Sequence, residues 1–218
     1  MKFFIDTAEI DEIKSLSELG LVDGVTTNPS LIYKSGQDFK KVIKEISSII
    51  EGPISAEVTS KDSGEMIAQG KELAKIAKNI VVKVPLTKDG LIACKLLSSN
   101  NIKVNVTLCF SSSQALLAGK LGASYISPFI GRLDDISSTG LALIKEIVEI
   151  YNLYKDDIKT EVLAASIRSP LQVSQVASMG AHVATIPPKI IYQMINHPLT
   201  DAGLETFMND WKKTGQKF

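Results

Sequence analysis

The sequence contains few residues of the kinds that mark disulfide-rich or metal-binding proteins. It has two cysteines and two histidines in 218 residues. Cys94 and Cys109 form no CxxC pair and lie in apolar surroundings, so we expect reduced core thiols. His182 and His197 have no ligand-like spacing to each other or to either cysteine. The sequence therefore predicts no disulfide framework, no metal site and no cofactor.

Net charge and long apolar runs are also lacking. Lys plus Arg and Asp plus Glu both number 24, so no overall basic field exists to attract nucleic acid or an anionic membrane. The N-terminal apolar run, residues 3–5, is too short for a signal peptide, and no stretch approaches transmembrane length. We therefore expect a cytoplasmic protein without nucleic-acid or membrane partners, in which any functional positive charge is local.

The same hydrophobic pattern continues through the whole chain, and no linker interrupts it. Short apolar runs alternate with longer segments of helical period, which predicts strands and helices in turn. The runs are Lys2 to Ile5, Gly24 to Thr26, Ile54 to Val58, Ile80 to Val84, Val104 to Leu108, Tyr125 to Ser127, Glu161 to Ala165 and Val183 to Ile186. Eight such runs predict an α/β fold with a single (β/α)8 TIM barrel over residues 1–218, with an open sheet as the alternative.

Amphipathic segments fill the spaces between these runs. Two of them carry clear start signals, Ser111 before one helix and the pair Ser169 and Pro170 at another. The predicted helices span residues 8–19, 38–50, 61–78, 90–99, 112–121, 139–154, 170–179 and 188–196.

A ninth helix is predicted at the C-terminus, over residues 201–213. Leu204, Phe207, Met208 and Trp211 repeat there with the i, i+3, i+4, i+7 spacing of an apolar stripe. Because eight helices already cover a barrel, this additional helix either caps the barrel or packs on a neighbouring subunit. The second possibility predicts a homo-oligomer.

Polar residues gather at the ends of the predicted strands, where βα barrels carry their functional side chains. The eighth strand contributes little to this set. The set comprises Asp6, Thr26, Thr27, Asn28, Glu57, Thr59, Lys83, Asn105, Thr107, Ser127, Arg132, Ser166 and Arg168.

Lys83 lies inside an otherwise apolar strand, Ile80 to Val84. Alternation puts Val81 and Lys83 on one face, which we expect to point into the barrel. An ammonium group there is costly unless it is paired or loses its proton, and a neutral amine can attack a carbonyl. The alternative is a structural lysine in an ion pair with Asp6 or Glu57.

Two carboxylates accompany this lysine. Asp6 ends the first apolar run, where it is either a site residue or the N-cap of the helix that follows. Glu57 lies inside the third run and needs a partner if it faces the barrel centre. A lysine with two carboxylates supplies a nucleophile and proton-transfer groups for breaking a carbon–carbon bond next to an iminium.

Arg132 and Arg168 are the only arginines, and every other basic residue is a lysine. They follow the sixth and seventh strands, the region where barrels commonly bind phosphate, and arginine binds phosphate with paired hydrogen bonds. The alternative is a pair of solvated loop arginines.

Five segments of the chain resemble the transaldolase family, in its small-subunit branch. The resemblance extends from residue 4 to residue 168, and the length and the C-terminal helix suit the same branch. The segments are Phe4-Ile5-Asp6-Thr7-Ala8, Gly24-Val25-Thr26-Thr27-Asn28-Pro29-Ser30-Leu31, Val81-Val82-Lys83-Val84-Pro85-Leu86-Thr87, Ser127-Pro128-Phe129-Ile130-Gly131-Arg132 and Ala164-Ala165-Ser166-Ile167-Arg168.

The resemblance implies a metal-free aldol mechanism within the pentose phosphate pathway, in which a dihydroxyacetone unit passes from a ketose phosphate to an aldose phosphate. It implies that Lys83 forms the Schiff base and that Asp6 is the acid and base for C3–C4 cleavage. Glu57 and Thr107 would hold a water used in proton transfer. Asn28, Asn105 and Ser127 would bind the three-carbon unit, and Arg132, Ser166 and Arg168 the phosphate. The implied substrate-binding set is Thr26, Asn28, Asn105, Ser127, Phe129, Arg132, Ser166 and Arg168.

The same branch includes fructose-6-phosphate aldolase, which releases dihydroxyacetone. By the resemblance, that activity goes with glutamine at the position of Glu57 and tyrosine at that of Phe129, so Glu57 and Phe129 favour transfer. The alternatives are this aldolase, another Schiff-base aldolase, and a barrel that only binds sugar phosphates. The resemblance also implies a pentamer or a decamer, with the C-terminal helix on a neighbour.

Overall fold

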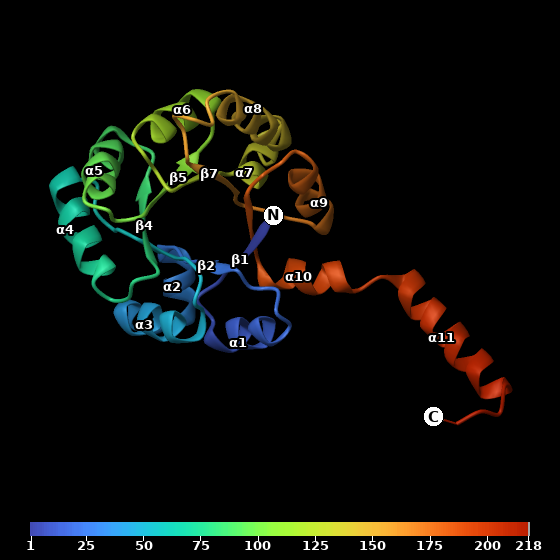
Figure 1. The fold of residues 1–218 in the computed structure, drawn as a ribbon. Coiled ribbons are helices and arrows are strands. Elements are labelled where there is room, and N and C mark those ends of the chain that lie inside the picture. The colour runs from blue at the N-terminus through green and yellow to red at the C-terminus, as the bar shows by residue number, and fades with distance from the viewer. Residues whose placement is uncertain (218) are drawn as a thin grey trace.

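The computed structural model of the chain describes residues 1–217, so the last residue of the expected domain, Phe218, lies outside the described part. Eight parallel strands close into a barrel in sequence order (Figure 1). The first strand pairs with the eighth, which excludes the open sheet and confirms the predicted (β/α)8 barrel. The strands are β1 (Lys2–Asp6), β2 (Gly24–Thr26), β3 (Ile54–Glu57), β4 (Ile80–Pro85), β5 (Val104–Cys109), β6 (Tyr125–Pro128), β7 (Glu161–Ala164) and β8 (Val183–Ile186).

Helices surround the strands as an outer ring, and a last helix extends beyond it (Figure 1). The helices are α1 (Ile10–Glu18), α2 (Pro29–Ser35), α3 (Phe39–Ile49), α4 (Ser63–Ala74), α5 (Lys88–Ser99), α6 (Ser112–Lys120), α7 (Ile130–Asp134), α8 (Gly140–Leu153), α9 (Pro170–Ser178), α10 (Pro188–Ile195) and α11 (Pro198–Lys213).

The strands lie within one residue of their predicted ends, whereas two short helices, α2 and α7, are not among those predicted. The signals for α2 are present in the sequence. Asn28 caps it by accepting a hydrogen bond from Leu31 N, Pro29 occupies the first turn, and Gly36 ends it with φ 65°. Seven residues are too few to show a helical period, which explains why this helix was missed.

The helix after β1 begins later than predicted. α1 starts at Ile10 with Glu9 as its N-cap residue, so the interpretation of Asp6 as a helix cap is wrong. The other start signals are confirmed, because Ser111 accepts a hydrogen bond from Gln114 N and Ser169 accepts one from Gln172 N.

The barrel interior has an apolar layer beneath a polar one. Side chains two residues apart on a strand share a face, so Val81 lies one layer below Lys83, while Val82 and Val84 pack in the outer core against the helices. The apolar layer, here called the apolar plug, is a separate buried cluster of Phe4, Val81, Tyr125, Leu163, Ala165 and Val183.

Strand β5 departs from regular alternation near its end. Leu108 has a left-handed φ of 60°, and the register with β6 shifts at this point. Alternation from Asn105 and Thr107 would turn Cys109 inward, but Cys109 packs in the outer core instead. Burial raises the pKa of the Cys109 thiol to about 12 and that of Cys94 to about 11, which keeps both in the protonated form.

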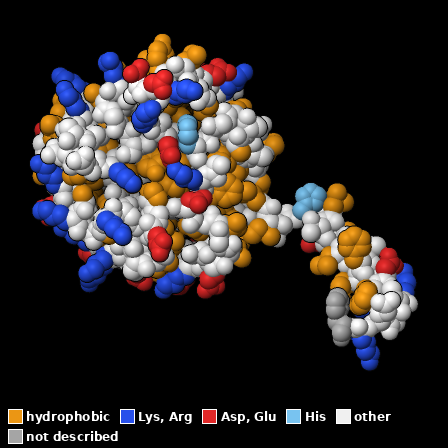
Figure 2. Space-filling model, in the orientation of Figure 1, with side chains coloured by type: hydrophobic (Ala, Val, Ile, Leu, Met, Phe, Trp, Pro, Cys, Tyr) orange, Lys and Arg blue, Asp and Glu red, His pale blue; other side chains and the backbone are white. Residues whose placement is uncertain are grey.

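Helix α11 stands away from the barrel, and orange side chains gather along it in Figure 2. It begins at Pro198, three residues before the predicted start, because His197 accepts a hydrogen bond from Leu199 N and proline favours the first turn. None of its residues is buried, so the alternative that this helix caps its own barrel is wrong. Leu199, Leu204, Phe207 and Met208 are between 50% and 75% exposed.

None of the helices within residues 1–217 combines the length and the apolar character that crossing a membrane requires.

Candidate functional site

A cavity of about 500 Å³ lies over the carboxyl ends of the strands. Ten of the twelve predicted site residues line it, and the remaining two, Glu57 and Asn105, lie directly behind lining residues and contact them. The ten are Asp6, Thr26, Asn28, Lys83, Thr107, Ser127, Phe129, Arg132, Ser166 and Arg168.

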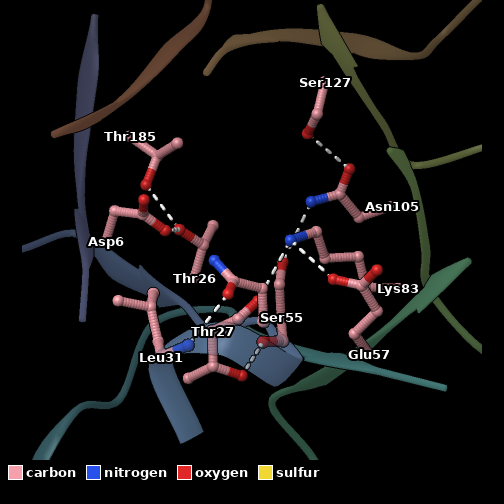
Figure 3. A network of polar contacts seen from close by, with 11 residues as sticks. Asp6, Thr26, Thr27, Leu31, Ser55, Glu57, Lys83, Asn105, Ser127 and Thr185 are labelled. Carbon is pink, nitrogen blue, oxygen red and sulfur yellow. Dashed lines mark hydrogen bonds and ion pairs between the residues drawn. The ribbon is translucent and has the colours of Figure 1, made fainter. Parts of the chain in front are cut away.

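Lys83 lies at the floor of this cavity and is 4% exposed. Its Nζ lies 3.0 Å from Glu57 Oε2 and donates a hydrogen bond of 3.0 Å to the carbonyl oxygen of Thr27 (Figure 3). β3 and β4 pair Glu57 with Lys83 in register, which places the two side chains next to each other. The ion pair with Glu57 that was considered as an alternative is therefore present, at a position that opens into the cavity.

Asp6 belongs to a chain of hydroxyl contacts on the other side of the floor. Thr26 donates a hydrogen bond of 2.8 Å to Asp6 Oδ1 and also contacts the Thr185 hydroxyl (Figure 3). Burial raises the pKa of the Asp6 carboxyl, while the charge of Lys83 and the hydrogen bond from Thr26 oppose this rise. A raised pKa makes this carboxyl group a better proton acceptor than an ordinary aspartate, as a general acid and base requires.

Asn105 holds a second polar chain together. Its amide nitrogen donates to Ser55 Oγ at 3.1 Å, and its amide oxygen accepts a hydrogen bond of 2.7 Å from Ser127 Oγ (Figure 3). Asn105 is fully buried, whereas Ser127 reaches the cavity wall. Asn105 therefore orients Ser127 by this hydrogen bond, and Ser127 rather than Asn105 lines the cavity.

Thr107 presents a buried hydroxyl to the cavity. Among the described residues, its Oγ1 has no hydrogen-bond partner, and buried polar atoms in this state are uncommon in proteins. The next residue is the left-handed Leu108, and backbone strain of this kind gathers at functional sites. The left-handed residue Leu108 therefore directly follows Thr107, whose unpartnered hydroxyl faces the cavity.

The cap of α2 also faces the cavity. Asn28 uses its side-chain oxygen to accept the hydrogen bond from Leu31 N at 3.0 Å, so its amide hydrogens are left to donate. Asn28 and Glu57 together line a smaller apolar pocket of about 270 Å³ behind this wall.

Arg132 lies in helix α7 rather than in a loop, and its guanidinium group sits 4.9 Å from the centre of the Phe129 ring. Phe129 in turn contacts Phe110 edge to face, with ring centres 5.9 Å apart. The Phe129 ring gives Arg132 an aromatic face, over which a cation is stabilised.

Arg168 approaches the same region from the loop after β7. Its guanidinium donates to Asp135 at 2.9 Å, and both side chains are more than half exposed. Ser166, two residues earlier, has a left-handed φ of 61°. A Cβ atom on Gly131 would lie 2.2 Å from the Ser166 carbonyl oxygen and 2.6 Å from Arg168 Nε, so only glycine lets α7 and this loop approach so closely.

The prediction that the eighth strand contributes little is wrong. Thr185, two residues beyond Val183 on the inner face, contacts Thr26 and lines the cavity. Alternation from Val183 pointed to it, but a single threonine in an apolar strand is a weak signal. Four further polar residues, which were not among the predicted site residues, line the cavity from α2 and α10, namely Ser30, Lys34, Lys189 and Gln193.

In the part of the chain that the structure describes, no group of three or more His, Cys, Asp or Glu side chains is placed to hold a metal ion. The charged residues that line the cavity are mainly cations. They are Lys34, Lys83, Arg132, Arg168 and Lys189, with the carboxylate Asp6.

A closed parallel barrel with a polar, lysine-containing cavity over the carboxyl ends of its strands defines a βα-barrel protein with an enzyme-type site. Residues 3–218 match the family described as Transaldolase/Fructose-6-phosphate aldolase. The chain belongs to this family.

Relatives of full length carry matching names. The chain is 58% identical over 217 residues to a protein of Thermoanaerobacter sp. (strain X514) named "Probable transaldolase", with 100% of both chains covered. It is 62% identical to a protein of the same name from Parvibaculum lavamentivorans, with 100% and 99% covered. Family membership and these names indicate an enzyme of the transferase class.

Among solved structures, thiamine phosphate pyrophosphorylase from Pyrococcus furiosus is similar with a TM-score of 0.56 and 16% identity, over 85% of each chain. At this identity the likeness is one of fold alone.

Proposed function

We propose that the chain is a transaldolase of the pentose phosphate pathway, working through a Schiff base on Lys83. It transfers a dihydroxyacetone unit from sedoheptulose 7-phosphate or fructose 6-phosphate to an aldose phosphate. The observation that carries the proposal is a primary amine, 4% exposed, at the floor of a cationic cavity, between the carboxyl groups of Glu57 and Asp6.

The first half of the reaction forms the Schiff base. The Lys83 amine attacks the C2 carbonyl of the ketose, and the carbinolamine loses water to give an iminium. Glu57 Oε2, 3.0 Å from Nζ, is placed to take the proton that the amine must lose. The unpartnered hydroxyl of Thr107 supplies a second hydrogen-bonding group, and we assign to this residue and Glu57 the binding of the water that carries protons.

The second half breaks and remakes a carbon–carbon bond. The Asp6 carboxylate takes the proton of the C4 hydroxyl, the C3–C4 bond breaks, and its electron pair moves to the iminium to give an enamine on Lys83. The aldose phosphate leaves as an aldehyde. The enamine then attacks the carbonyl carbon of an acceptor aldehyde, Asp6 returns its proton to the new hydroxyl, and water releases the ketose.

Borohydride trapping tests this proposal. Treatment of the protein with fructose 6-phosphate and borohydride should leave a reduced, mass-detectable adduct on Lys83. Absence of an adduct would exclude both transaldolase and Schiff-base aldolase, and would leave a barrel that only binds sugar phosphates. Rapid release of glyceraldehyde 3-phosphate in the absence of erythrose 4-phosphate would favour the aldolase over the transferase.

We assign to Phe129 a role in deciding whether the enamine is protonated and released or transferred to an acceptor. It lines the cavity and carries no hydroxyl that could protonate the enamine, so the intermediate persists until an acceptor aldehyde arrives. Phe129→Tyr is expected to raise the ratio of aldolase to transfer rates by about tenfold, because the phenol supplies a general acid. Coupled assays of free glyceraldehyde 3-phosphate and of transfer product measure this ratio.

Phe110→Tyr is the matched control, because Phe110 contacts Phe129 but does not line the cavity. An unchanged ratio in Phe129→Tyr, or an equal rise in both variants, would contradict the role of Phe129.

We assign the binding of the substrate's phosphate group to Arg168, together with Arg132 and Ser166. Arg168→Ala should lower kcat/KM for phosphorylated substrates by about 10- to 100-fold, mainly through KM, because a charge-assisted hydrogen-bond pair is lost. Unphosphorylated acceptors such as erythrose should be affected much less. Steady-state kinetics with both substrate classes measure the difference.

Asp135→Ala serves as the control for Arg168. It breaks the same exposed ion pair but keeps the guanidinium group, so it should have a small effect on either substrate class. Equal losses for phosphorylated and unphosphorylated substrates in Arg168→Ala would show that Arg168 supports the loop rather than the phosphate.

We further propose that α11 packs on a second copy of the chain in a homo-oligomer, a pentamer or a decamer. The support is its exposed apolar stripe, carried on a helix that no part of its own barrel buries. Sedimentation velocity tests this proposal, and a monomer at working concentrations would contradict it.

A further inference from the structure

Two helices beside the cavity mouth carry matching polar pairs that the proposed mechanism does not use. Ser30 and Lys34 are four residues apart on α2, and Lys189 and Gln193 are four residues apart on α10. Residues at this spacing share one helix face, and all four line the cavity. They are also exposed, as expected at a mouth. We call these four residues the lysine wall.

The topology places the two halves of the lysine wall on either side of Asp6. α2 follows β2 and α10 follows β8, and these are the two strands that pair with β1. Arg132 and Arg168 instead follow β6 and β7. The cavity therefore has cations on two sides, from different elements.

The charges of the lysine wall are not balanced locally. Within residues 1–217, no hydrogen bond or ion pair joins Lys34 or Lys189 to another side chain, whereas Arg168 is paired with Asp135. The whole chain has a formal net charge of zero, yet five cations and one carboxylate line this cavity. Such an excess at a concave site concentrates anions at its mouth.

The wall also has the donors that a phosphate monoester needs. Lysine ammonium groups bind phosphate oxygens as point charges, and the hydroxyl of Ser30 and the amide of Gln193 add neutral donors. With Arg132 and Arg168 assigned to the bound substrate, these four groups form a separate set.

We propose that the lysine wall is a second anion-binding surface, which captures the phosphate group of an incoming sugar phosphate at the cavity mouth. The proposal rests on the proposed function for the identity of the substrate, but not for the binding of an anion. It makes Lys34 and Lys189 determinants of the preference for phosphorylated over free sugars.

The test is the double variant Lys34→Gln/Lys189→Gln, assayed at saturating fructose 6-phosphate with erythrose 4-phosphate or erythrose as the acceptor. We expect kcat/KM for erythrose 4-phosphate to fall by about three- to tenfold and to depend less on salt, because exposed lysines contribute modest, screened attraction. The kcat value and kcat/KM for erythrose should stay unchanged.

Lys71→Gln/Lys95→Gln is the control, because it removes the same charge from exposed positions on α4 and α5 that do not line the cavity. A fall for erythrose 4-phosphate that is equal in the two double variants would overturn the proposal, since net charge would then explain it. So would an equal fall for both acceptors.

Calorimetric titration with inorganic phosphate separates this proposal from the proposed function. Weaker binding by Lys34→Gln/Lys189→Gln than by the control supports the lysine wall even if borohydride traps no adduct. Unchanged phosphate binding and unchanged kinetics in a protein that does form the adduct would overturn the lysine wall and leave the transaldolase proposal intact.

Discussion

Replacing Lys83 by methionine is expected to lower transfer activity by about 10⁴-fold or more, because the proposed reaction has no covalent intermediate without this amine. Borohydride should then trap no adduct with fructose 6-phosphate. Methionine matches the length of the apolar stem and suits Val81, which lies one layer below, so the barrel should fold. Transfer assays and intact-protein mass spectrometry measure the two effects.

Lys83→Arg is the sharper comparison. Arginine keeps the positive charge beside Glu57, which is only 14% exposed at its side chain, but a guanidinium group does not form a Schiff base. Both variants should therefore be inactive, while Lys103→Met, at an exposed position before β5, should behave like the unchanged protein. Activity in Lys83→Arg close to that of the unchanged protein would reduce Lys83 to a structural partner of Glu57.

Asp6→Asn is expected to lower transfer activity by about 10²- to 10⁴-fold, the usual contribution of a positioned acid or base. The Schiff base should still form, because Lys83 and Glu57 remain. Borohydride should therefore trap the intact ketose on Lys83 in this variant. Trapping and transfer assays together place the defect at the cleavage step.

The same substitution should stabilise the protein at high pH. Burial raises the pKa of Asp6 above its ordinary value of 3.8, so the folded chain holds a proton over a pH range in which the unfolded chain has released it. Stability is then lost as the pH rises through this range, and asparagine does not titrate. The difference in Tm between Asp6→Asn and the unchanged protein should therefore be small at pH 4 and larger at pH 8. Each kcal/mol of unfolding free energy that the substitution restores should raise Tm by about 2–4 °C.

Asp156→Asn, at an exposed position after α8, controls for the loss of one negative charge. A Tm difference for Asp6→Asn that is independent of pH, or that matches the control, would show that burial of this carboxyl does not strain the fold.

The barrel was predictable because its strands are apolar on both faces and stand out as short runs. Lys83 and Glu57 interrupt such runs. Period-two alternation predicted that Lys83 points into the barrel, whereas the register of β3 and β4 was needed to place Glu57 beside it. Short helices were harder, because five or seven residues show no period. α7 was missed for this reason, although it carries Arg132.

The site was predictable where strand ends fix the side chains, and less so where helices do. The inner face of β8 included Thr185, but one hydroxyl gave too weak a signal. The four-residue spacings of Ser30 and Lys34 on α2 and of Lys189 and Gln193 on α10 are visible in the sequence, whereas the direction in which each helix face points depends on packing. The pairing of Arg168 with Asp135 and the left-handed turn at Leu108 also depend on tertiary contacts.

The apolar plug has a consequence for the order of events. It closes the barrel beneath Lys83 with buried side chains such as Phe4, Tyr125 and Leu163, so the cavity opens on the opposite side, over the carboxyl ends of the strands. Under the proposed reaction, the first aldehyde must leave by the opening through which the second one arrives. The two half-reactions therefore alternate on this side of the barrel, and between them the three-carbon fragment stays bound to Lys83 above the apolar plug.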